Sequence, residues 1–196
     1  MNETFNYYTE KAREFAESTR FVDMSDIHRR FLSRLAPGAK ILDVGCGSGR
    51  DSRAFSDLGY KTSAIDAVPA MCEAARTFCG INAECMSVLD LDRRDEFDGV
   101  WACASLLHLK KDELPEAFIR ICRALKTGGV FYASFKLGEF SGVRNGRYFT
   151  DLTEDMLKSL AHQIGGLQIE EIFITSDARK GREAELWLNA IFSKTN

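Results

Sequence analysis

Apolar and polar positions along the chain follow two different periods, one after the other. Four short apolar runs fit strands that are buried on both faces, at residues 39–45, 61–66, 97–103 and 128–135. Segments with apolar residues at helical intervals lie between them, at residues 68–78 and 112–125. Because parallel neighbours need crossover connections, we predict an α/β doubly wound fold with helices on both faces of a parallel sheet.

The two ends of the chain depart from this alternation. Residues 1–38 are expected to form a helical cover over the sheet, whose second helix ends before Pro37. Two apolar runs at 167–175 and 183–194, separated by a short polar segment, predict a terminal antiparallel hairpin. Because no repeat or long linker interrupts the chain, we expect residues 1–196 to form a single domain.

Composition and charge narrow the classes of function. The chain has 196 residues, is 45% hydrophobic and carries a net charge of -3, which does not suggest a basic face for nucleic acid. Its six cysteines contain no C-x-x-C pair and its three histidines have no zinc spacing, so we expect reduced thiols and no metal. Since no segment resembles a signal peptide or a membrane span, we expect a soluble, cytoplasmic protein whose oligomeric state stays open.

Three glycines, Gly45, Gly47 and Gly49, follow the first apolar run at alternate positions. In an open α/β sheet, ligands bind beyond the carboxyl ends of the strands, where the first strand-to-helix turn lies. Glycine lets the backbone bend tightly there and approach a ligand closely. Asp43 precedes this turn, and Asp66 ends the second apolar run about 20 residues later, where it would accept hydrogen bonds from a ribose.

Three kinds of ligand compete for such a turn. A phosphate-binding P-loop needs a lysine followed by serine or threonine, and Arg50 and Asp51 stand there instead. A dinucleotide fingerprint needs a third glycine at the position of Arg50, and the Asp43 carboxylate would repel a pyrophosphate. A ligand with an amino group and a ribose but no phosphate fits both Asp43 and Asp66, so both are candidate cofactor contacts.

Several segments together carry a family resemblance. The segment LDVGCGSG, Asp66 and the run FDGVWACASLLHL resemble the Rossmann-like class I S-adenosylmethionine-dependent methyltransferases, over roughly the whole chain. The segments GCGSGRDS, LLHL, GGVFYASFK and GRYF are similar to a small bacterial group described as tellurite-resistance-like methyltransferases. The resemblance implies a seven-stranded sheet in the order 3-2-1-4-5-7-6 with only the seventh strand antiparallel. It also implies S-adenosyl-L-methionine as cofactor and S-adenosyl-L-homocysteine as product.

The same resemblance implies roles for individual residues. The methionine part of the cofactor would lie against Gly45, Cys46 and Gly47, the ribose against Asp66, the adenine against Ala67, Val88 and Leu89, and the sulfonium near Ala102 and Cys103. Tyr8, in the amino-terminal cover, would close over the methionine end.

Some of these residues also have a purely structural interpretation. Asp43 would then cap the following helix, and we interpret Cys46 and Cys103 as packing residues rather than nucleophiles. His108 is a candidate catalytic base near the acceptor, and a structural histidine at the start of the next helix is the alternative. With few other bases expected, the pattern favours a soft or already anionic nucleophile.

Residues 137–151 are expected to form a long loop over the carboxyl ends of the strands, ending in a helix start at Asp151-x-x-Glu154. Such loops often form substrate walls. Arg144 and Arg147 would supply fixed positive charge and Tyr148 a shielding ring, so the loop would clamp an anionic acceptor. The alternative is a solvated loop whose aromatic residues enter the core.

These patterns predict an S-adenosylmethionine-dependent methyltransferase that acts on a small molecule, either anionic or a soft nucleophile. The alternatives are an RNA methyltransferase and a non-catalytic S-adenosylmethionine-binding protein. DNA is disfavoured as a partner, because ACAS at 102–105 replaces the N-P-P-Y type motif of DNA amino-methyltransferases.

Overall fold

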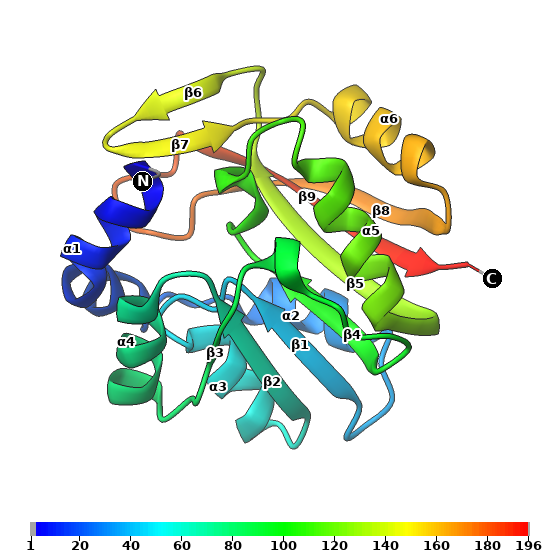
Figure 1. Ribbon diagram of the computed structural model, residues 1–196, viewed down its shortest axis with the longest axis horizontal. Coiled ribbons are helices and arrows are strands. Elements are labelled where there is room, and N and C mark those ends of the chain that lie inside the picture. Colours follow the sequence, from blue (N-terminus) through cyan, green and yellow to red (C-terminus); the bar gives the residue numbers. More distant parts are fainter. Residues whose placement is uncertain (1–2, 196) are drawn as a thin grey trace.

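The structure, a computed structural model, describes residues 3–195 (Figure 1). Within this range seven strands form one sheet in the order β3-β2-β1-β4-β5-β9-β8, and two further strands form a separate hairpin. The strands are β1 (Lys40–Val44), β2 (Lys61–Asp66), β3 (Glu84–Cys85), β4 (Phe97–Ala102), β5 (Leu125–Lys136), β6 (Ser141–Arg144), β7 (Arg147–Thr150), β8 (Leu167–Ser176) and β9 (Leu186–Lys194).

The sheet order confirms the expected 3-2-1-4-5-7-6 arrangement, with β9 and β8 in the places of the seventh and sixth strands. Strands β1 to β5 pair in parallel, whereas β9 runs antiparallel to both β5 and β8. The predicted terminal hairpin is therefore present. The strand numbers differ by two because β6 and β7 form their own small sheet within the described residues.

Helices cover both faces of the sheet. They are α1 (Glu3–Thr19), α2 (Ser25–Leu32), α3 (Arg50–Asp57), α4 (Pro69–Cys79), α5 (Leu114–Ala124) and α6 (Glu154–Ile164), with short 3-10 turns η1 (Val88–Asp90) and η2 (Leu106–His108). None of the helices among residues 3–195 is long and apolar enough to cross a membrane.

Side chains of each central strand alternate between two cores. Trp101 of β4 packs against Phe31 of α2 and Phe55 of α3, at ring distances of 5.2 and 5.3 Å. Its neighbours Val100 and Ala102 are buried in the other core, which contains residues of α5 and α6. This period of two decides which strand residues can reach a ligand at the strand ends.

The first two helices differ in what they cover. Helix α2 packs on the sheet through Phe31, whereas α1 packs on the start of α4, where Ala12 contacts a cluster with Val68 and Met71. Figure 1 shows the amino-terminal end of α1 next to the β6–β7 hairpin. There the amide of Tyr148 donates to the Thr4 hydroxyl over 2.8 Å. Helix α1 therefore joins α4 to this hairpin.

Residues 137–151 contain a two-stranded hairpin rather than an irregular loop, which corrects the expectation. Its two-residue turn is Asn145-Gly146, with φ of 52° and 76°. Asparagine and glycine tolerate positive φ, and turns of this kind match the twist of paired strands. The helix start is corrected as well, because α6 is capped by Thr153, whose hydroxyl accepts from the Met156 amide over 3.3 Å.

The turns after β1 and β4 lie so close together that residue 45 has no room for a side chain. Gly45 has φ of +69°, and a Cβ atom placed on it would lie 2.4 Å from the Cβ of Ser105. Real Cβ atoms do not pack at such a distance, so only glycine fits both the backbone conformation and the space. The two turns can therefore meet here only because residue 45 has no side chain.

We expect Gly45→Ala to lower the free energy of unfolding by about 2–5 kcal/mol, through a strained left-handed conformation and a clash with Ser105. Gly59→Ala is the matched control, since Gly59 has φ of +87° but nothing within 4 Å of the added Cβ. The control should lose only about 1–2 kcal/mol, the cost of the conformation alone. Urea unfolding measures both, and equal losses would contradict the close approach.

Candidate functional site

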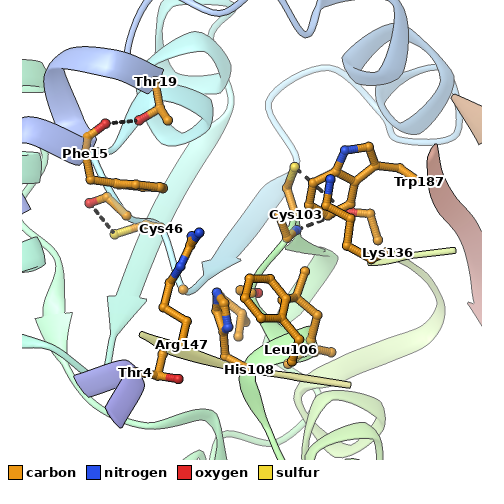
Figure 2. A pocket seen from close by; sticks show the side chains of 18 of the residues that line it. Thr4, Phe15, Thr19, Cys46, Cys103, Leu106, His108, Lys136, Arg147 and Trp187 are labelled. Atoms are coloured by element: carbon orange, nitrogen blue, oxygen red, sulfur yellow. Dashed lines mark hydrogen bonds between the residues drawn. The ribbon is translucent and has the colours of Figure 1, made fainter. Parts of the chain in front are cut away.

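A cavity of about 820 Å³ opens at the carboxyl ends of the parallel strands. Figure 2 shows Phe15, Thr19 and Cys46 on one side of it and Cys103 and Trp187 on the other. Most of the residues predicted to form the site line it: Tyr8, Gly45, Cys46, Gly47, Asp66, Ala67, Val88, Leu89, Cys103, His108, Arg144 and Arg147. The structure thus brings residues from distant parts of the chain to one cavity.

The glycine turn is fastened to the end of β2. The amides of Gly45 and Cys46 both donate to the carbonyl oxygen of Ile65, over 2.8 and 3.0 Å. The amide of Gly47, which has φ of +56°, donates to Asp66 Oδ2 over 3.0 Å. The turn therefore presents a fixed backbone edge to the cavity.

Asp66 is buried at the end of β2 with its carboxylate held in one orientation. Oδ2 accepts from the Gly47 amide, and Oδ1 accepts from the Val68 amide over 2.9 Å. Burial raises the pKa of Asp66, and these two amide hydrogen bonds oppose the rise. Each carboxylate oxygen has further acceptor capacity, so the pair suits two neighbouring hydroxyl donors such as those of a ribose.

The expected adenine contacts lie together beside this carboxylate. Ala67, Val88 and Leu89 line the same cavity, the last two from η1. The Ser87 hydroxyl accepts from the Leu89 amide over 3.2 Å and so fixes this turn. The result is an apolar slot next to a buried carboxylate, and these residues fit a nucleoside.

Asp43 and Ala102 do not line the cavity, which corrects their expected place beside the ligand. The Asp43 carboxylate accepts a hydrogen bond from the Ser52 hydroxyl of α3 over 2.6 Å. Burial, together with the charge of Asp51, raises the pKa of Asp43 to about 7. Asp43 points to the same face of the sheet as Ile41, because strand side chains alternate. In the structure, Asp43 therefore helps to hold α3 against β1.

Burial of the two cysteines at the cavity disfavours a role as nucleophile. Burial raises the pKa of Cys46 far above its usual range and that of Cys103 to about 12. A thiol that stays protonated at neutral pH is a poor nucleophile, so both residues fit the interpretation as packing. Within residues 3–195, no group of three or more His, Cys, Asp or Glu side chains is arranged to hold a metal ion.

His108 takes part in a chain of hydrogen bonds at the cavity wall. Its Nδ1 lies 2.7 Å from the carbonyl oxygen of Tyr148, and its Nε2 lies 3.0 Å from the Tyr8 hydroxyl. A carbonyl only accepts, so Nδ1 carries the proton and Nε2 of the neutral ring accepts from Tyr8. The Arg147 guanidinium in turn donates to the Tyr8 oxygen over 3.3 Å.

Burial lowers the pKa of His108 to about 4, and the positive charges of Arg147 and Arg144 act in the same direction. The hydrogen bond to the Tyr148 carbonyl opposes this shift. His108 is therefore neutral at pH 7. Tyr148 differs from its predicted role, because its ring does not line the cavity and its hydroxyl pairs with Ser141 over 2.9 Å.

The two arginines of the hairpin have different partners. Arg144 makes a two-pronged ion pair with the buried carboxylate of Asp151, over 2.8 and 2.7 Å. Arg147 forms no ion pair with any described residue, its buried Nε atom has no hydrogen-bond partner there, and its guanidinium lies 4.7 Å from the Tyr7 ring centre. Figure 2 shows its side chain reaching into the pocket next to His108. Of this pair, only Arg147 keeps its charge available.

Sequence reasoning missed the far wall of the cavity. Lys136 ends β5 there, with its ammonium 3.2 Å from Asp177 and 4.0 Å from the Trp187 ring centre. Arg179 binds the same Asp177 carboxylate over 2.6 Å. The position of Lys136 at the carboxyl end of a buried strand was a usable signal, whereas the connection between β8 and β9 gave none.

Comparisons with known proteins relate part of the chain to methyltransferases. Residues 41–129 match the family model described as a methyltransferase domain. A ubiquinone biosynthesis O-methyltransferase of Xanthomonas campestris is 38% identical over 106 residues, which cover 50% of this chain and 43% of that protein. The match thus spans less than half the length of this relative.

Two solved structures share the fold over most of the chain. One is the 1,6-didemethyltoxoflavin-N1-methyltransferase of Burkholderia thailandensis with bound S-adenosylhomocysteine: TM-score 0.77, 21% identity, 97% of this chain and 85% of that one. The other is a TehB-like S-adenosylmethionine-dependent methyltransferase of Corynebacterium glutamicum: TM-score 0.69, 23% identity, 97% of this chain and 98% of that one.

The sheet order, the glycine turn and the matched domain together define a class of protein. Residues 41–129 match a methyltransferase domain, and the chain has the class I, S-adenosylmethionine-dependent methyltransferase fold.

We expect Asp66→Asn to weaken binding of S-adenosylhomocysteine by about 1.5–3 kcal/mol, the scale of hydrogen bonds to a charged group. Asp43→Asn is the matched control, since Asp43 lies outside the cavity and an amide oxygen can still accept from Ser52. The affinity of Asp43→Asn for S-adenosylhomocysteine should equal that of the wild type. Calorimetry measures both values, and a similar loss in the two variants would contradict the assignment of Asp66.

Proposed function

We propose that the protein transfers a methyl group from S-adenosylmethionine to a small acid whose anionic group binds Arg147. One observation carries the acceptor class: Arg147 faces the cavity without a carboxylate partner among the described residues, while Arg144 beside it is paired. A partly buried guanidinium whose charge no carboxylate offsets is costly unless a ligand supplies the opposite charge. A carboxylate or another oxyanion satisfies both its charge and its planar donors.

The residues at the strand ends support the cofactor part of the proposal. Asp66 would hold the ribose hydroxyls, the turn at Gly45 and Gly47 the methionine part, and Val88 and Leu89 the adenine. When bound, S-adenosylmethionine supplies an activated methyl group on a sulfonium. The protein then has to hold the acceptor in line with this methyl group and exclude water. Tyr8, from α1, would close the cavity over it.

The size of the cavity favours a small acceptor. Ligand pockets commonly enclose about 300–1,000 Å³. At about 820 Å³ the cavity can hold a nucleoside cofactor together with a small second molecule. RNA methylation and binding without turnover are the alternatives, and transfer of labelled methyl to small acids separates both from the proposal.

We expect Arg147→Met to reduce methyl transfer to an acid by about 10- to 100-fold, because it removes a charged hydrogen-bond donor and keeps much of the bulk. The assay offers labelled S-adenosylmethionine with pairs of small hydroxy, amino and thiol acids and their primary amides. In the variant, acid and amide should be turned over alike, while S-adenosylhomocysteine affinity stays unchanged.

Arg144→Met is the control within the same hairpin. It leaves the Asp151 carboxylate unpaired, so the free energy of unfolding should fall by about 1–3 kcal/mol, yet the preference for acids should persist. Loss of S-adenosylhomocysteine affinity in Arg147→Met would assign this arginine to the carboxylate of the cofactor instead. A preference for amides in the wild type would also contradict the proposed acceptor.

A further inference from the structure

The hydrogen bonds around His108 run in one direction. Nδ1 donates to the Tyr148 carbonyl, the Tyr8 hydroxyl donates to Nε2, and the Arg147 guanidinium donates to the Tyr8 oxygen. The phenolic oxygen of Tyr8 has two lone pairs, and Arg147 occupies one of them. Because Tyr8 blocks Nε2, a proton from a molecule in the cavity can reach His108 only through the Tyr8 hydroxyl.

The charges that face His108 are unequal. Arg144 and Arg147 both oppose a positive charge on the ring, and Tyr8 faces it as a neutral donor. Asp151 already offsets the charge of Arg144. The charge of Arg147 is not offset by any described carboxylate, so a bound anion can offset it. An anion on Arg147 would favour the protonated ring.

We propose that an acid bound at Arg147 turns His108 into the proton acceptor of the reaction, reached through Tyr8. This rests on the proposed function and names the acceptor more closely. The nucleophile is a protic oxygen or nitrogen on a molecule that also carries an anionic group. The sequence favoured a soft nucleophile, but such a nucleophile would give this relay no proton to carry. A thiol ionises near neutral pH without a base.

The step is balanced in atoms and charge. A lone pair of the nucleophile forms the bond to the methyl carbon, and the electron pair of the broken carbon–sulfur bond stays on sulfur. The proton of the nucleophile passes to the Tyr8 oxygen while the Tyr8 proton passes to His108 Nε2. One positive charge moves from the sulfonium to the imidazolium, and the anion on Arg147 stabilises it there.

Nitrogen-15 NMR of the three histidines tests the electrostatic part without turnover. His108→Gln assigns the signal, and the exposed His162 serves as the internal reference. In the S-adenosylhomocysteine complex, His108 should be the neutral Nδ1–H tautomer at pH 7. Its pKa should rise by about one unit or more in Arg147→Met. Formate should raise it in the wild type and not in the variant, and neutral formamide should do so in neither.

Kinetics with the acids that the methyl-transfer screen identifies test the relay. Tyr8→Phe keeps the ring and removes the relay hydroxyl, so turnover of hydroxy or amino acids should fall by about 10²- to 10⁴-fold. Turnover of a matched thiol acid should fall far less, because a thiolate needs no relay, and the ratio of the two losses is the result that counts.

Several results would overturn the inference: a charged or Nε2–H ring at pH 7, a pKa that ignores Arg147 and formate, methylation of thiol acids alone, or full activity of Tyr8→Phe. If no acid is methylated although S-adenosylhomocysteine binds, the proposed function fails as well. The NMR result then still shows whether Arg147 controls His108.

Discussion

The site depends on one steric constraint, the contact between the turns after β1 and β4. Gly45 has no side chain at the point where Ser105 lies, so the two strand ends meet without a gap. The same turn is bonded to β2 through Ile65 and Asp66. These contacts fix three strand ends relative to one another, and the carboxylate of Asp66 has a defined orientation before any ligand arrives. Such preorganisation reduces the ordering cost of binding.

A second constraint is the distribution of charge on the β6–β7 hairpin. Arg144 and Arg147 are close in sequence, and both line the cavity, yet only Arg144 has a carboxylate partner among the described residues. The free charge of Arg147 lies beside Tyr8 and His108, and in the proposed function it would influence both anion binding and proton transfer. Substrate recognition and acid–base chemistry would then share one side chain.

Local spacing made the alternating fold, the terminal hairpin, the glycine turn and the place of Asp66 predictable, because neighbouring residues determine turns and strand ends. The order of the strands in the sheet came from the family resemblance. It was harder to predict to which face each strand residue points. Asp43 lies on the α3 side because side chains alternate, and Tyr148 points away from the cavity that Arg147 and Phe149 line, for the same reason. The Asn145-Gly146 turn signalled this hairpin. The pairing of Arg144 with Asp151 is a tertiary contact that no local pattern encodes.

The anion site proposed for the acceptor is distinct from the binding site proposed for the cofactor. A crystal structure of the S-adenosylhomocysteine complex tests this separation most directly. We expect the ribose hydroxyls on Asp66 and the homocysteine carboxylate away from Arg147, whose guanidinium still faces the open part of the cavity. An ion pair between Arg147 and the homocysteine carboxylate would contradict the account, because the anion site would then belong to the cofactor.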